Sequence, residues 1–193
     1  MMVALSSLVN ECTSLVLNGG WPAGFLLVLL ESFIPILPLG AFVALNVNAF
    51  GFFTGTILSW IATVTGCYIT YLIFYYISNN FIFKIIKPQT KEKILNKTSK
   101  FKTIKLTNLV LIITLPFAPS CFINLMSGIA GITKQKYIIS LIIGKALMIT
   151  FWAYVGKSLI ESLTNIKAII FILVLLLIAY IITKYITKKF EIE

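Results

Sequence analysis

Long apolar stretches, separated by short polar ones, are the feature that most limits what this 193-residue sequence can fold into. Hydrophobic residues make up 59% of the chain and charged residues 11%, whereas a soluble domain averages about 25% charged residues. A helix in a soluble domain needs apolar residues on one face only, so an excess on every face has to meet lipid. The chain is therefore predicted to be an all-α integral membrane protein that crosses a cell membrane several times.

The charged residues indicate the orientation of the chain and its partners. Lysine supplies all of the positive charge, and half of the 16 lysines fall between Lys84 and Lys105. Because lysine beside apolar spans favours the cytoplasmic side, we expect this connector and the C-terminus to be cytoplasmic. Anionic lipid headgroups, and not nucleic acid, are the expected partners of Lys84–Lys105. The sequence has no His and no Asp, so no catalytic triad, metal site or cofactor is predicted.

Two of the apolar segments are interrupted by a pair of prolines. Pro35 and Pro38 interrupt residues 21–50, and Pro116 and Pro119 interrupt residues 106–132. Proline ends a helix because it lacks an N–H group and its ring clashes with the preceding turn. Each half is then too short to span a membrane, which takes about 20 residues. Each segment is predicted to be a re-entrant helical hairpin, although kinked spanning helices remain an alternative.

The order of the segments predicts an internal repeat. Each proline pair is followed by a glycine and by an apolar helix that is long enough to span. The expected organisation is an interfacial helix at 1–20, a membrane domain at 21–160, a C-terminal transmembrane helix at 166–184 and a cytoplasmic tail at 185–193. Within the membrane domain we expect hairpin 1 at 21–50, a transmembrane helix at 52–78, the basic cytoplasmic connector at 79–105, hairpin 2 at 106–132 and a transmembrane helix at 137–157.

The two hairpins are predicted to be inverted relative to each other. If the connector is cytoplasmic, the second hairpin opens to the cytoplasm and the first opens to the opposite side. Inverted repeats with broken helices are typical of transporters. Backbone groups freed by proline are tolerated only inside protein or beside a water-filled cavity, so the breaks indicate a path for something polar.

Three stretches resemble a known family. They are ESFIPILPLGAFVALNVNAFGFFTG from Glu31, GCYITY from Gly66 and PFAPSCFINLMSGIAGI from Pro116. Together they resemble the two halves of the DedA / VTT-domain superfamily (SNARE-associated Golgi protein-like), and the last is closest to its VTT branch. The resemblance implies two oppositely oriented re-entrant hairpins and the movement of lipids or lipid carriers across bilayers. The family commonly has an Arg before the second proline pair, where Ile113 and Thr114 stand here, and this departure favours scrambling without a proton gradient.

Several residues are candidates for a transport path. Glu31 is an acid inside an apolar run, which is costly and by default functional, and the resemblance marks it as the family's Glu; it could carry a proton, or sit solvated at the hairpin mouth. Lys145 lies mid-span and is expected to pair with Glu31, to bind a lipid phosphate, or to line a wet crevice without a specific role. Asn124 could cap a broken helix or meet a headgroup. The predicted path comprises Glu31, Pro35, Pro38, Pro116, Pro119, Asn124 and Lys145.

Small and aromatic residues are assigned to packing. Glycine lets helices approach closely in lipid, and the predicted packing positions are Gly66, Gly128, Gly131 and Gly144. Trp21, Trp60 and Trp152 are interpreted as interface or packing aromatics.

The function predicted from these features is the movement of a phospholipid or lipid carrier between leaflets by a scramblase- or flippase-like protein that is not an enzyme. One alternative is a proton- or ion-coupled transporter of a small solute, which requires a gradient and Glu31. Another is a non-transporting membrane scaffold, in which Glu31 and the prolines affect assembly only. Assembly into a homo-oligomer stays open.

Overall fold

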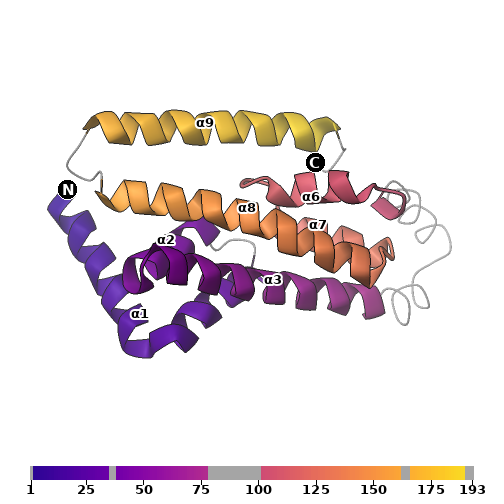
Figure 1. Cartoon of the computed structure of the whole chain (residues 1–193), viewed down its shortest axis with the longest axis horizontal. Coiled ribbons are helices and arrows are strands. Elements are labelled where there is room, and N and C mark those ends of the chain that lie inside the picture. Colours follow the sequence, from indigo (N-terminus) through magenta and orange to yellow (C-terminus); the bar gives the residue numbers. More distant parts are fainter. Residues whose placement is uncertain (1, 35–37, 78–100, 162–165, 190–193) are drawn as a thin grey trace.

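The computed structural model describes residues 2–34, 38–77, 101–161 and 166–189, and these form helices and the turns between them (Figure 1). The all-helical prediction is confirmed for this part of the chain. Pro35, most of the lysine-rich connector and the last four residues lie outside it. The helices are α1 (Met2–Glu31), α2 (Leu39–Phe50), α3 (Phe52–Ile77), α6 (Leu106–Thr114), α7 (Ser120–Ile129), α8 (Lys134–Glu161) and α9 (Ile166–Lys189).

Several helices are suited to a membrane. Three segments of the described chain are long and apolar enough to cross one, namely Thr13–Glu31, Phe52–Ile77 and Lys134–Ser158. The outer faces of α3 and α8 expose large apolar side chains, which a soluble protein would bury. These include Ile57, Ile61 and Ile73 on α3 and Ile139, Ile143 and Leu147 on α8. The chain is a membrane protein, as its composition predicts.

Helix α1 changes direction near its middle. Gly20 has the non-helical angles φ 63° and ψ −163°, so α1 consists of two arms, residues 2–19 and 21–31, that meet at an angle (Figure 1). Pro22 lies in the first turn of the second arm, where its missing N–H group costs no helical hydrogen bond. The kink falls at the predicted boundary between the interfacial helix at 1–20 and the first hairpin. The second arm alone is too short to span a membrane.

The two proline pairs lie where short helices end and begin. Pro38 is the residue before α2 and Pro119 is the residue before α7. Their backbone angles are similar, with φ −81° and ψ 96° at Pro38 and φ −70° and ψ 95° at Pro119. A helix start tolerates proline because its first N–H groups have no partner within the helix. The same local conformation therefore recurs in both apolar segments.

The short helices pack against opposite ends of α3 (Figure 1). Near the start of α3, a Cβ atom on Gly55 would lie 2.3 Å from the backbone oxygen of Asn46 in α2. Near its end, a Cβ atom on Gly128 of α7 would lie 2.8 Å from the backbone oxygen of Tyr71. At the middle of α3, a Cβ atom on Gly66 would lie 2.6 Å from the side chain of Ser32, the first residue after α1. Helix α2 and helix α7 therefore pack near opposite ends of α3, and the end of α1 reaches the middle of α3 between them.

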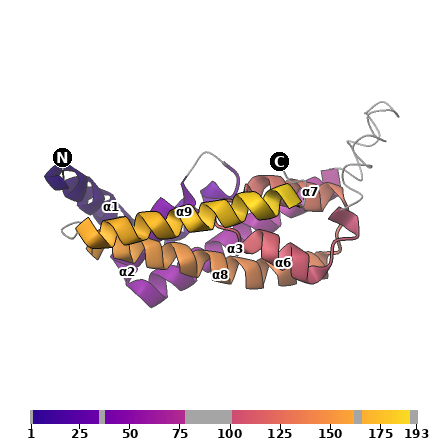
Figure 2. The same ribbon diagram turned by 90° about the horizontal axis from the view of Figure 1, so that it is seen from above.

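Helix α8 contacts α2, α3, α6 and α9. A Cβ atom on Gly144 would lie 2.8 Å from the side chain of Ile113 in α6, so this glycine also permits close packing. Gly131 is different, because a Cβ atom there would have no neighbour within 4 Å. Its φ of 67° requires glycine for the turn before α8, and this replaces the packing role expected for it. Helix α9 runs along the outside of α8 (Figure 2).

The buried side chains form two clusters. One surrounds the second arm of α1 and α2, and the other surrounds α6 and α7. The first joins α1, α2, the first half of α3 and the second half of α8, and includes Val28, Val43, Ala62 and Ile149. The second joins the remaining halves of α3 and α8 with α6 and α7, and includes Tyr71, Ile112, Ile123 and Leu141. Residues beside the breaks belong to these clusters, with Leu39 in the first and Leu115 and Ala118 in the second.

The replacement Gly55→Ala is expected to lower the thermal stability of the protein in detergent. The new methyl group would overlap the backbone of α2, which cannot yield as a flexible side chain can, and overpacking of this kind costs about 1–3 kcal/mol. A thermal unfolding scan that follows tryptophan fluorescence measures the effect. Thr54→Ala, at an exposed neighbouring position, is the control and should behave like the native protein. Equal stability of both variants would contradict the close packing of α2 on α3.

Candidate functional site

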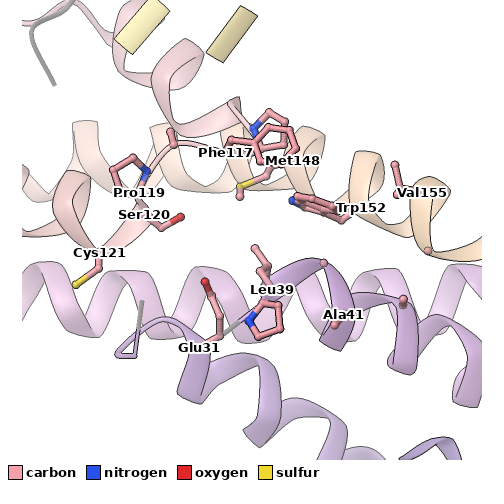
Figure 3. A pocket seen from close by; sticks show the side chains of 16 residues that line it. Glu31, Leu39, Ala41, Phe117, Pro119, Ser120, Cys121, Met148, Trp152 and Val155 are labelled. Carbon is pink, nitrogen blue, oxygen red and sulfur yellow. The ribbon is translucent and has the colours of Figure 1, made fainter. Parts of the chain in front are cut away.

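A cavity of about 560 Å³ lies between the two helix breaks (Figure 3). The cavity lies between two units of the fold, the first comprising the second arm of α1 with α2 and α3, and the second comprising α6, α7 and α8. The first unit contributes Glu31 at the end of α1 and the start of α2. The second contributes the break from Pro116 to Cys121 and one face of α8 from Met148 to Gly156. Most of the lining is apolar. The few polar groups therefore decide what the cavity can bind.

Two helix N-termini form part of the wall. Leu39 and Gly40 begin α2, Ser120 and Cys121 begin α7, and all four residues line the cavity. The first N–H groups of a helix have no intrahelical partner, and this end carries the positive part of the helix dipole. The breaks thus give the cavity two regions of partial positive charge that come from the backbone.

Glu31 supplies the negative charge. Its side chain is 8% exposed and its carboxyl group points into the cavity (Figure 3). The Oε2 atom is buried and has no hydrogen-bond partner among the described residues. A buried carboxylate without a partner costs several kcal/mol, so Glu31 offers a ligand an unfilled acceptor.

Lys145 lies behind the cavity wall on α8. It is 2% exposed, and its Nζ atom donates to the hydroxyl of Ser120 at 2.7 Å and to the sulfur of Met148 at 3.4 Å. Both of these partners line the cavity. Lys145 and Glu31 are buried groups of opposite charge, and they form no direct ion pair among the described residues. The predicted association of the two charges is therefore a longer-range attraction in which Ser120, and not Glu31, accepts the lysine hydrogen bond.

Trp152, which the sequence indicated to be an interface or packing aromatic, contributes a hydrogen-bond donor to the cavity. Its Nε1 atom is buried, has no hydrogen-bond partner in the described part of the chain, and faces the interior of the cavity (Figure 3). A Cβ atom on Gly40 would lie 2.5 Å from the indole ring, so only glycine there lets the ring fit. The spacing of Lys145, Met148, Trp152 and Val155 places all four on one helix face, which is the sequence signal that could have identified Trp152.

The predicted path residues separate into two groups. Glu31, Pro38, Pro116 and Pro119 line the cavity, and Lys145 supports it. Asn124 does not line it. Pro35 is outside the described residues.

Asn124 has a different environment between helices. It is buried, and its Oδ1 atom accepts a hydrogen bond of 2.5 Å from the hydroxyl of Tyr137 on α8. Asn46 of α2, which sequence reasoning missed, donates to the hydroxyl of Ser59 on α3 at 3.0 Å and to the backbone oxygen of Gly24 at 3.1 Å. In both pairs the two side chains are 13 residues apart. Each asparagine thus links the second short helix of its unit to the long helix that follows.

Comparisons with known proteins agree with this architecture. The family model of the VTT domain matches residues 37–158. The "Uncharacterized membrane protein YhjE" of Bacillus subtilis (strain 168) is 30% identical over 167 residues, which cover 81% of this chain and 75% of the relative. No solved structure matches. The matched family segment contains α2, the second break and the lining face of α8, and the resemblance stated from the sequence motifs is confirmed.

Glu31→Gln and Lys145→Met are expected to destabilise the protein less in combination than the sum of their separate effects. Each single variant leaves one buried charge without its opposite, whereas the double variant removes both. Non-additivity equivalent to about 0.5–3 kcal/mol is expected for such a pair, and unfolding scans in detergent measure it. Glu31→Gln combined with Lys134→Met, at the first residue of α8, is the control and should be additive. Additive effects in both pairs would contradict the coupling of Glu31 with Lys145.

Proposed function

Because the chain belongs to the VTT domain family of membrane proteins, we propose that it moves lipids between the two leaflets of a bilayer. The observation that carries this proposal is the cavity between the two breaks. It contains Glu31 Oε2, which has no hydrogen-bond partner in the described part of the chain, and large apolar side chains are exposed on the outer faces of α3 and α8. Lipid movement breaks no covalent bond, so the protein would act as a scramblase and not as an enzyme.

In this proposal the two pairs of short helices are re-entrant and inverted. These helices have nine to twelve residues and are about 14–18 Å long, which is roughly half of the about 30 Å of hydrocarbon in a bilayer. The second arm of α1 with α2 would enter from one face, and α6 with α7 from the other. The lysines between α3 and α6 favour the cytoplasmic side for the second pair.

The barrier that such a protein has to lower is the passage of a polar headgroup through hydrocarbon. The polar groups of Glu31, Ser120 and Trp152, together with the two helix N-termini, would replace the headgroup's water near the midplane. The lining face of α8, Met148 to Gly156, extends about 12 Å from this point toward the non-cytoplasmic end. The acyl chains would stay outside, against the exposed apolar side chains.

Filling the cavity should stop lipid movement. Purified protein in liposomes that contain fluorescent lipid is treated with dithionite, which bleaches only the outer leaflet until inner-leaflet lipid exchanges. Ser120→Trp is expected to slow the exchange phase about tenfold or more, which corresponds to an increase of about 1.4 kcal/mol in the barrier. Leu147→Trp, on the exposed face of α8, is the matched control and should exchange lipid at the native rate.

The same assay separates the rival functions. A scramblase works without any gradient. A proton-coupled transporter of a small solute requires a proton gradient and loses activity in Glu31→Gln, and a scaffold moves no lipid in any variant. Absence of protein-dependent lipid exchange in liposomes of several compositions, with or without a proton gradient, would overturn the proposed function.

A further inference from the structure

We propose that the cavity prefers headgroups that carry a primary ammonium group together with a phosphate, as zwitterionic aminophospholipids do. The observation behind this is that a buried acceptor, Glu31 Oε2, and a buried donor, Trp152 Nε1, have no hydrogen-bond partner among the described residues and face the same cavity. The inference rests on the proposed function and names the chemical class of lipid for that site.

The acceptor side of the cavity requires a cation that can donate hydrogen bonds. Glu31 is nine-tenths buried, so a neutral apolar group beside it would leave its charge uncompensated. A primary ammonium group brings one positive charge and three N–H donors. The quaternary ammonium of a choline headgroup has the charge but no N–H donor, and its methyl groups keep the charge further from the carboxylate.

The donor side of the cavity fits phosphate oxygens. Trp152 Nε1 is an N–H donor, and the hydroxyl of Ser120 accepts from Lys145, which leaves the Ser120 hydrogen available for a ligand. The N-termini of α2 and α7 also lie at the wall. Helix N-termini favour anions because their first N–H groups have no partner within the helix. Lys145 increases the positive potential at Ser120. A phosphate can thus be held at several points on the side of α7 and α8.

The balance of charge selects against net-anionic headgroups. Glu31 and Lys145 are groups of opposite charge, and both are buried at the site. A zwitterionic headgroup supplies a positive charge to Glu31 and a negative charge to the Lys145 side. A glycerol phosphate headgroup supplies only the negative charge, so the carboxylate stays uncompensated and faces a second anion. The cavity of about 560 Å³ is within the range of about 300–1,000 Å³ of small-molecule sites.

The test is a comparison of headgroups in the dithionite assay. Proteoliposomes receive trace amounts of phosphatidylethanolamine, phosphatidylcholine or phosphatidylglycerol, each labelled on an acyl chain so that the headgroup is free. The native protein is expected to exchange phosphatidylethanolamine about tenfold faster than the other two, which corresponds to about 1.4 kcal/mol. Trp152→Phe retains the aromatic packing on Gly40 and loses the N–H donor, so this rate ratio should fall toward one.

Two further variants make the comparison specific. Glu31→Gln removes the charge and keeps the shape, and it should also reduce the ratio. Trp60→Phe is the matched control, because the Nε1 atom of Trp60 bonds the backbone oxygen of Ile142 at 3.1 Å and Trp60 does not line the cavity. Its ratio should remain native. If either Trp152→Phe or Glu31→Gln fails to fold, the other variant still measures the ratio of the lipid exchange rates.

The outcomes separate this inference from the proposed function. Equal exchange of the three lipids by the native protein, or an unchanged ratio in Trp152→Phe, overturns the headgroup preference and leaves lipid movement intact. Uptake of soluble phosphoethanolamine by the proteoliposomes without lipid exchange retains the ammonium–phosphate chemistry and overturns the lipid as its source. No protein-dependent movement of lipid or phosphoethanolamine overturns both proposals.

Discussion

In hydrocarbon, a backbone N–H or C=O group without a partner costs several kcal/mol, and this constraint governs the arrangement of the broken helices. Pro38 and Pro119 begin α2 and α7 in the middle of apolar segments, so the first N–H groups of both helices need an environment other than lipid. The fold places both helix starts at one cavity. Close approach of the two units is therefore a condition for having the breaks, and the contacts of Gly40 in α2 with Trp152 in α8 and of Gly128 in α7 with Tyr71 in α3 provide it.

The stability of the folded protein does not explain the buried charges of Glu31 and Lys145. Buried opposite charges can often be replaced by apolar residues of similar volume with little loss of stability or even a gain. Here Lys145 has two hydrogen-bond partners, whereas Glu31 Oε2 has none among the described residues. A buried group that is not satisfied within the protein is understandable if a ligand completes it. The same reasoning applies to Trp152 Nε1. Among the buried side-chain atoms without a partner in the described residues, these two lie at the cavity, and one ligand could complete both.

Composition and motifs were sufficient to predict the helical class, the membrane environment and the family, because each depends on residue types along the chain. The ends of α1 and α6 and the starts of α2 and α7 were also accessible from the sequence, since proline acts locally. The side chains that meet at the cavity were less accessible. Trp152 and Ser120 acquire their roles only when α8 and α7 face α2, and the bond between Asn46 and Ser59 depends on the packing of α2 on α3. Asn124 has the expected hydrogen-bonding capacity but uses it on Tyr137.

The central claim is that the two pairs of short helices dip into the bilayer from opposite faces without crossing it. Labelling of single cysteines in intact cells by a membrane-impermeant reagent tests this most directly, after the native cysteines have been replaced. Cysteines at Lys105 and Thr133, which flank α6 and α7, should both be protected from the outside, and cysteines at Asn18 and Thr54, which flank the second arm of α1 with α2, should both react. If Lys105 and Thr133 are labelled from different sides, α6 and α7 together span the membrane, and the cavity between two inverted hairpins cannot be the lipid path.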